Sequence, residues 1–170
     1  MGWIYEINKT NTARYVLGEI NNDHSATLIC FGVNPSTASP NALDNTILKI
    51  RKIAYNNNYS NWIMLNLYPQ RATDPKQLDL LERKCYSQTN LVHIRNVILK
   101  YSNADILFAY GNLISQRPYL KKSLKDILNL LDRDFGGDLY VIKMTKKGNP
   151  IHPLYQPDSS RLIKTNFCAV

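Results

Sequence analysis

The sequence lacks the glycine-rich loops that bind nucleotide phosphates in the commonest cofactor-dependent folds. Neither G-x-G-x-x-G nor G-x-x-x-x-G-K-[ST] occurs among its 170 residues. A dinucleotide-binding site and a P-loop are therefore not predicted. The G-x-S-x-G turn that presents a nucleophilic serine is also absent, so serine chemistry of the α/β-hydrolase kind is not expected.

Cysteine is scarce, and long apolar runs are missing. The three cysteines are too far apart in the sequence to pair as metal ligands: Cys30, Cys85 and Cys168. We expect them to be free, buried thiols in a reducing cytosol. No stretch approaches the roughly 20 apolar residues of a membrane span. The first ten residues lack the basic and apolar segments of a signal peptide. We therefore predict a cytoplasmic protein that uses neither a metal nor a cofactor and does not associate with membranes.

Basic residues outnumber acidic ones, which gives a formal charge of +8 and a pI near 9.4. A charge of this size attracts polyanions. The lysines and arginines are spread along the chain rather than grouped, so a merely lysine-rich surface explains the charge as well as a nucleic-acid partner does.

Four continuous apolar runs have the length of buried strands. They span residues 26–33, 61–68, 104–111 and 138–144, and helical spacing of apolar residues lies between them at 43–57, 75–101 and 117–132. The stretch 75–101 is either one helix or two that are separated by a break near residues 86–90. Residues 3–20 resemble two short antiparallel strands around a turn. This order predicts a single α/β domain over 1–170, a three-layer α/β/α sandwich with a central, mainly parallel four-stranded sheet and a short N-terminal β-hairpin.

Polar and turn-forming residues follow each of the four predicted strands. The first strand ends in "GVNPST", the second in "NLYPQRATDP", the third in "AYGN", and the fourth leads into "TKKGNPIHPLYQP". Ligands of open parallel sheets bind at the carboxyl ends of the strands. A polar pocket is therefore expected there, with binding residues Gly32, Pro35, Ser36, Thr37, Asn66, Gly111, Asn112 and Pro153.

Two resemblances rest on these motifs. The segments "NPSTA" (34–38), "LDNT" (43–46) and "NLYPQRATDP" (66–75) resemble a family of small bacterial and phage domains without an assigned function, over roughly residues 12–157. More remotely, "GVNPS" (32–36), "LNLYPQRAT" (65–73) and "IHPLYQP" (151–157) are similar, in the same order, to motifs of the uracil-DNA glycosylase superfamily, especially its mismatch-specific and thymine-DNA branch.

The second resemblance implies a uracil-DNA glycosylase-like fold and a monomeric enzyme that flips a damaged or modified base, including a phage modification, out of DNA and excises it by hydrolysis. Two alternatives stay open. One is an enzyme that acts on free nucleosides or nucleotides, and the other is a non-catalytic nucleic-acid-binding module of the same fold.

The resemblance also assigns three catalytic candidates. Asn34 would hold the attacking water or stabilise the departing base. Asp44 would act as general base or balance the positive charge on the sugar, although an ordinary helix N-cap explains it as well. His152 would donate to the base or to a phosphate, and the alternative is a surface histidine fixed by the proline after it.

The remaining candidates would contact the nucleic acid. Arg71 would bind a phosphate through both guanidinium nitrogens, or else form an ion pair with Asp74 or Asp44. Lys147, with Lys146 beside it, would contact the DNA backbone or belong to a solvated turn. Stacking on a flipped base is expected of one or more tyrosines, namely Tyr68, Tyr110 and Tyr155.

Overall fold

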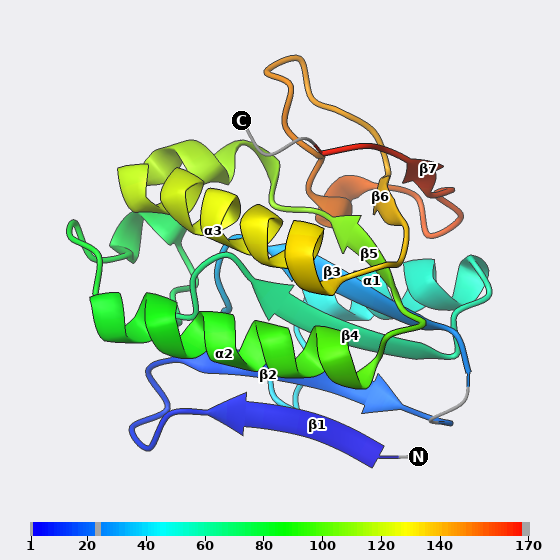
Figure 1. The fold of residues 1–170 in the computed structure, drawn as a ribbon, viewed down its shortest axis with the longest axis horizontal. Helices are drawn as coiled ribbons and strands as arrows, with labels where there is room; N and C mark the ends of the chain where they lie inside the picture. Colours follow the sequence, from blue (N-terminus) through cyan, green and yellow to red (C-terminus); the bar gives the residue numbers. More distant parts are fainter. Residues whose placement is uncertain (1, 23–24, 168–170) are drawn as a thin grey trace.

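A seven-stranded sheet forms the centre of the molecule in the computed structural model, which describes residues 2–22 and 25–167 (Figure 1). The strand order is β1-β2-β4-β3-β5-β6-β7. The strands are β1 (Gly2–Ile7), β2 (Arg14–Ile20), β3 (Thr27–Gly32), β4 (Asn61–Asn66), β5 (Asp105–Phe108), β6 (Leu139–Val141) and β7 (Ile163–Lys164). The α/β class expected from the sequence is confirmed.

The sheet differs from the predicted one in width and in strand direction. Strands β4, β3, β5 and β6 pair in parallel, whereas β1 with β2, β2 with β4, and β6 with β7 pair antiparallel. The sheet is therefore mixed, with seven strands instead of four. The N-terminal hairpin does not stand apart, because Leu17 to Glu19 of β2 pair with Trp62 to Met64 of β4. Strand β7 has only two residues, too few for an apolar pattern to reveal.

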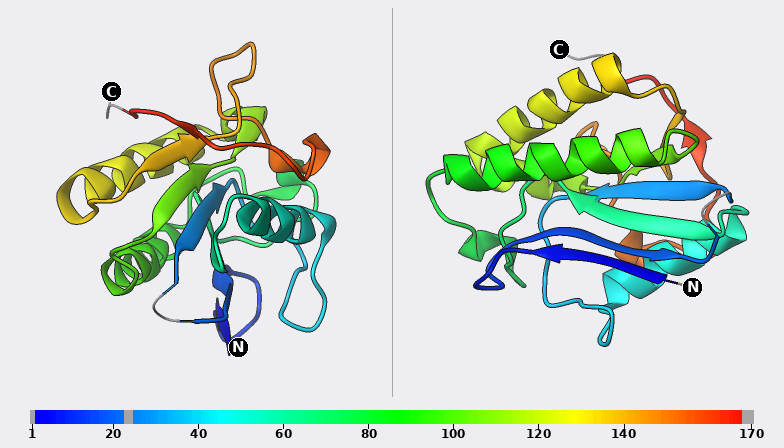
Figure 2. Two further views of the ribbon diagram at one scale, coloured as in Figure 1. Left: turned by 90° about the vertical axis from the view of Figure 1, so that its right-hand side faces the viewer. Right: turned by 60° about the horizontal axis from the view of Figure 1, so that its bottom comes forward.

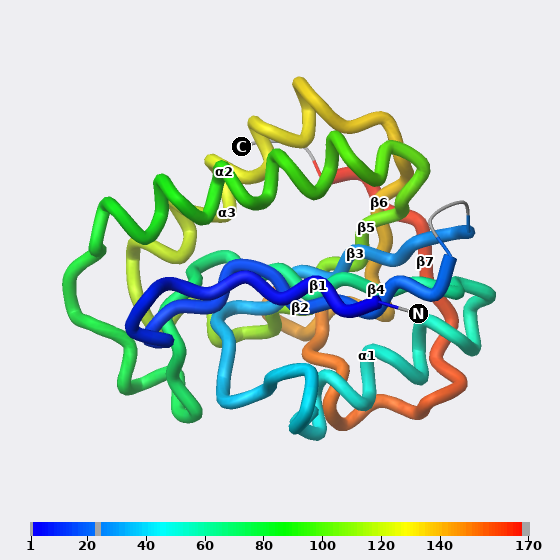
Figure 3. Tube along the Cα trace, turned by 90° about the horizontal axis from the view of Figure 1, so that it is seen from below, coloured from blue at the N-terminus to red at the C-terminus, as the bar shows by residue number. Residues whose placement is uncertain are grey.

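Helices cover both faces of the sheet (Figures 2 and 3). Helices α2 (Lys84–Lys100) and α3 (Pro118–Asp134) lie on one face, and α1 (Asn45–Asn56) lies on the other. Neighbouring residues of β3 serve opposite cores: Ile29 and Phe31 pack in the core that includes α2 and α3, and Leu28 and Cys30 pack in the one that includes α1. A strand buried on both faces is apolar throughout, which explains its continuous hydrophobic run.

The helix predicted over 75–101 is two elements. A 3-10 turn, η1 (Pro75–Gln77), follows Asp74, whose side chain accepts the Lys76 N–H, and α2 begins only at Lys84. The helical pattern is interrupted before Lys84 and not near residues 86–90, because Leu78 and Leu81 fit a helical period although they lie in the loop between the two elements. Leu78 is buried, whereas Leu81 is 82% exposed.

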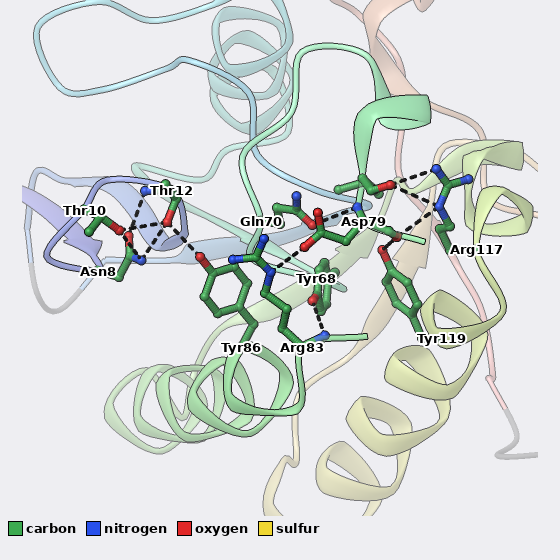
Figure 4. A network of polar contacts seen from close by, with 11 residues as sticks. Asn8, Thr10, Thr12, Tyr68, Gln70, Asp79, Arg83, Tyr86, Arg117 and Tyr119 are labelled. Carbon is green, nitrogen blue, oxygen red and sulfur yellow. Dashed lines mark hydrogen bonds and ion pairs between the residues drawn. The ribbon is translucent and has the colours of Figure 1, made fainter. Parts of the chain in front are cut away.

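Hydrogen bonds across the molecule anchor that loop (Figure 4). The Arg117 guanidinium donates to the carbonyl oxygens of Leu78 and Asp79, and the Tyr119 hydroxyl donates to the Asp79 carbonyl oxygen at 2.8 Å. These partners come from the start of α3, about 40 residues further along the chain. The loop is thus fixed by contacts that no local pattern reveals.

The cysteines differ in environment. Cys30 is buried in the sheet, and burial raises the pKa of its thiol well above the usual range. Cys85 is exposed, so the expectation of a buried thiol was wrong at this position. Cys168 lies outside the described residues. Within the described part of the chain, none of the helices has both the length and the apolar character that crossing a membrane requires.

Candidate functional site

A cavity of about 340 Å³ opens at the carboxyl ends of β3 and β4. Its volume is at the small end of the range for ligand pockets. The loop after β3, the start of α1, the segment 72–75 and the segment 152–155 surround it. Its lining comprises Arg14, Gly32, Val33, Asn34, Pro35, Ser36, Asp44, Thr46, Ile47, Met64, Asn66, Ala72, Thr73, Pro75, Leu113, His152, Leu154 and Tyr155.

The cavity brings together all three catalytic candidates and several of the binding candidates. Segments more than 100 residues apart in the sequence meet there, because the two parallel strands end side by side and the loop after β6 returns to the same edge. The predicted residues that line it are Asn34, Asp44, His152, Gly32, Pro35, Ser36, Asn66 and Tyr155.

Asn34 braces two loops at the cavity wall. Its side-chain Nδ2 donates to the carbonyl oxygens of Pro35, at 3.1 Å, and Ala72, at 2.8 Å. The Ala72 N–H returns a hydrogen bond to the Pro35 carbonyl oxygen. Because both amide protons are engaged, only Oδ1 of Asn34 is left to accept a hydrogen bond from a water or ligand. An aspartate at position 34 would place a carboxylate oxygen next to the two carbonyl oxygens, which would repel it. The substitution is therefore expected to disturb the loops, although aspartate has nearly the same shape as asparagine.

Asp44 is the N-cap of α1, which was one of the two roles expected for it from the sequence. Its Oδ1 accepts the Ile47 N–H at 2.9 Å. Its Oδ2 has no hydrogen-bond partner within the described residues, and the side chain lines the cavity. One oxygen therefore serves the helix while the other is available to the cavity, so capping and chemistry do not exclude each other.

His152 presents a fixed, neutral imidazole. Its Nδ1 accepts the Leu154 N–H at 3.3 Å, which leaves the proton of the neutral ring on Nε2. Burial lowers the pKa of His152 below its ordinary value, and the nearby Asp44 carboxylate opposes that shift only in part. At neutral pH the ring is thus an uncharged donor through Nε2.

Gly111 sets the position of the His152 backbone. Its φ is +62°, and its N–H donates to the Pro150 carbonyl oxygen at 2.9 Å. A Cβ at Gly111 would lie 3.2 Å from the Cβ of His152. The glycine therefore serves the cavity without lining it.

We expect Gly111→Ala to lower the free energy of unfolding by more than the roughly 1–2 kcal/mol of a left-handed alanine, because His152 must also shift. Gly148→Ala is the matched control: its φ is +75°, but nothing lies within 4 Å of a new Cβ. Urea unfolding of both variants measures the difference. Equal losses would show that the His152 segment yields freely to the new methyl group.

Asn66, at the end of β4, is fully buried, and neither its Nδ2 nor its Oδ1 has a hydrogen-bond partner in the described structure. Buried amides are almost always paired, so two unpaired atoms on one side chain require an explanation. Asn90 of α2 supports the same strand end, because its Nδ2 donates to the Asn66 carbonyl oxygen at 2.9 Å. The backbone at Asn66 is thus held while the side chain has no partner.

Arg14 was not predicted, although it lines the cavity and is only 1% exposed. It is the first residue of β2, and its Nη1 donates to the Ala38 carbonyl oxygen at 3.1 Å. The only signal in the sequence was a charged residue at the start of a mainly apolar strand. We call Arg14 and Asn66, the two fully buried polar residues of the lining, the cavity floor.

Arg71 lies beside the cavity but does not line it. Its guanidinium donates to the carbonyl oxygens of Ser36 and Ala38 and to the Tyr5 hydroxyl. The expected ion pair of Arg71 with Asp74 or Asp44 is not seen among the contacts of the described residues. Its observed role is to hold the loop after β3.

Two of the tyrosine candidates belong to the core. Tyr68 is fully buried between Tyr86 and Tyr119, its hydroxyl accepts the Arg83 N–H (Figure 4), and burial raises its pKa to about 12. Tyr110 is 3% exposed, and burial raises its pKa to about 12 as well. Neither ring lines the cavity, so the expectation that they stack on a base does not fit these positions. Tyr155, 87% exposed, does line the cavity.

The other candidates do not line the cavity, although Thr37, Asn112 and Pro153 each adjoin a lining residue in the sequence. Thr37 is exposed, and Pro153 is buried in the first turn of η3 (Pro153–Tyr155). Asn112 accepts hydrogen bonds from Thr145 and Asn149 and so ties down the exposed turn that carries Lys147. Within the described residues there is no group of three or more His, Cys, Asp or Glu side chains that could hold a metal ion.

Comparison with known proteins assigns the chain to a family. The model of the family described as "Protein of unknown function (DUF1643)" matches residues 14–154, and the chain belongs to this family. The match runs from Arg14 to Leu154 and thus includes every residue of the cavity lining except Tyr155. Searches of curated proteins and of solved structures gave no match.

Proposed function

We propose that this member of the DUF1643 family hydrolyses the N-glycosidic bond of a damaged or chemically modified base in DNA, with the flipped base bound in the cavity. The observation that carries the proposal is the unpaired side-chain amide of Asn66 on the cavity floor. An amide offers one donor and one acceptor side by side, and the hydrogen-bonding edge of a nucleobase offers the complement.

The cavity walls supply groups for the bond cleavage. A water molecule attacks C1′, and the new C–O bond forms as the C1′–N bond breaks and its electron pair leaves with the base. Oδ2 of Asp44 accepts the proton of the water, and Oδ1 of Asn34 helps to hold that water. The Nε2–H of His152 donates to the departing base, whose negative charge it stabilises.

Several exposed residues suit a DNA strand. Tyr155 offers a large aromatic surface for stacking on a base, and Lys146 and Lys147 lie exposed on the turn after β6. The net charge of +8 favours approach to a polyanion. The uracil-DNA glycosylase-like fold remains part of this proposal.

The test is incubation of the protein with single-stranded and duplex oligonucleotides that each carry one modified base, followed by alkaline cleavage at abasic sites. We expect strand breaks with at least one modification and none with unmodified DNA. DNA binding should weaken with salt, log K falling by about 0.9 per unit of log salt concentration for each neutralised phosphate of duplex DNA. Salt-independent binding with no abasic sites would contradict the proposal and favour an enzyme of free nucleosides or nucleotides. Salt-dependent binding without cleavage would favour the non-catalytic module.

A further inference from the structure

The floor of the cavity holds a buried positive charge that the described residues do not neutralise. Arg14 is 1% exposed, and its Nε is buried without a hydrogen-bond partner. Its guanidinium forms no ion pair with any carboxylate of the described chain. A buried charge without a counter-charge costs several kcal/mol and is rarely kept without a reason.

A second guanidinium increases that cost. Arg71 donates to the same Ala38 carbonyl oxygen as Arg14, and its own Nε is also buried without a partner. Burial, with the repulsion from Arg71, lowers the pKa of Arg14 to about 10, and the attraction of Asp44 offsets this only partly. The two positive groups therefore converge on a neutral carbonyl oxygen beside the cavity.

The only other fully buried charge among the described residues shows how this protein neutralises such groups. Glu19, also on β2, is 0% exposed, and it accepts hydrogen bonds from Arg51, Tyr55 and Trp62. Both oxygens of that carboxylate are satisfied. Arg14 lacks an equivalent set of partners, and it differs from Glu19 in lining a cavity.

We propose that Arg14 is the receptor for an oxyanion, a phosphate or a carboxylate, carried by the ligand that fills the cavity. The guanidinium presents a planar set of donors that matches such a group in two-point contact. Asn66 on the same floor reads a neutral polar edge, so the ligand combines an acidic group with a nucleobase-like one. The acidic group is either the phosphate of a free nucleotide or an acidic substituent on a base in DNA. The inference shares the cavity with the proposed function but does not require base excision.

Ligand binding by wild type and Arg14→Met, measured by isothermal titration calorimetry, tests the proposal. The probes are inorganic phosphate, nucleosides paired with their 5′-monophosphates, and oligonucleotides in which one pyrimidine carries a carboxylate or lacks it. We expect the acidic member of at least one pair to bind wild type about 10- to 100-fold more tightly than its neutral partner, and Arg14→Met to lose that advantage. Tighter monophosphates identify a free nucleotide, and tighter carboxylated DNA identifies an acidic base.

Stability without a ligand provides a second readout. Arg14→Met removes an unpaired buried charge at similar length, so its melting temperature should equal or exceed that of wild type. Arg71→Met is the control and should melt lower, since Arg71 holds the loop after β3 through three residues. No preference for acidic probes, or the same preference in Arg14→Met, would overturn the inference. Base excision that is unaffected by Arg14→Met would support the proposed function and contradict the oxyanion role of Arg14. Oxyanion binding without base excision would support the role of Arg14 and contradict the proposed function.

Discussion

Replacement of Asp44 by asparagine is expected to lower base release by about 10²–10⁴-fold while the protein remains folded. The asparagine keeps an oxygen that can accept the Ile47 N–H, and asparagine is as good an N-cap as aspartate. It removes the negative charge from a side chain that lines the cavity and, with it, the oxygen that accepts the proton in the proposed mechanism. Cleavage rates on the best modified oligonucleotide, with urea unfolding of the same preparation, measure the two effects separately.

Asp74→Asn is the matched control for this change. Asp74 caps the neighbouring turn η1 through the Lys76 N–H, it is exposed, and it does not line the cavity. The same chemical substitution should therefore leave the cleavage rate unchanged. If Asp44→Asn retained full activity, Asp44 would be a helix cap only, and proton transfer would have to be assigned to another residue.

The edge of the sheet that bears the cavity could be predicted because its signals are local. Strands β3 and β4 come from continuous apolar runs, and they end at Gly32 and Asn66. Parallel strands that end together then bring Asn34, Asp44 and His152 to one place, although His152 is more than 100 residues away in the sequence. The polar residues at the ends of β3 and β4 thus contained most of the information about the cavity wall.

The cavity floor could not be predicted, because its character depends on contacts that are missing. Arg14 begins a strand of the N-terminal hairpin, and only the pairing of β2 with β4 carries it under the strand ends. No sequence pattern distinguishes a buried arginine that lacks a carboxylate partner from an exposed arginine. For Asn66, the sequence indicated that the residue lies at the end of a strand, but it could not indicate that the side-chain amide lacks hydrogen-bond partners.

The aromatic candidates show the opposite error. Tyr68 and Tyr110 follow strand ends just as the cavity residues do, yet both are packed in the core. The direction of a side chain after a strand depends on the loop. Here the Tyr68 ring packs between Tyr86 and Tyr119, and its hydroxyl accepts the Arg83 N–H. Strand-end position alone predicts proximity to the site but not orientation toward it.

Asn66→Leu is expected to stabilise the protein and to abolish base recognition. Leucine has the same branching as asparagine, and it removes two buried polar atoms that lack partners in the described structure. Each such atom costs roughly 1–3 kcal/mol, so the free energy of unfolding should rise by about that amount or more. Loss of the amide removes the donor and acceptor that we propose read the base, and cleavage should fall by about 10²–10³-fold, as for other lost preorganised contacts. Urea unfolding and the oligonucleotide assay give the two values.

Asn90→Leu makes the same change on a neighbouring buried asparagine and should have the opposite effect on stability. Although the Oδ1 of Asn90 is buried without a partner in the described structure, its Nδ2 donates to the Asn66 and Leu67 carbonyl oxygens, so leucine there removes both hydrogen bonds and should lower the free energy of unfolding. Stability gained at a ligand-binding position and lost at a supporting one is the pattern expected when a protein keeps a polar group for its ligand at a cost to its fold. If Asn66→Leu lowered stability as Asn90→Leu does, the Asn66 amide would have a structural partner, and the base-recognition role would have to be abandoned.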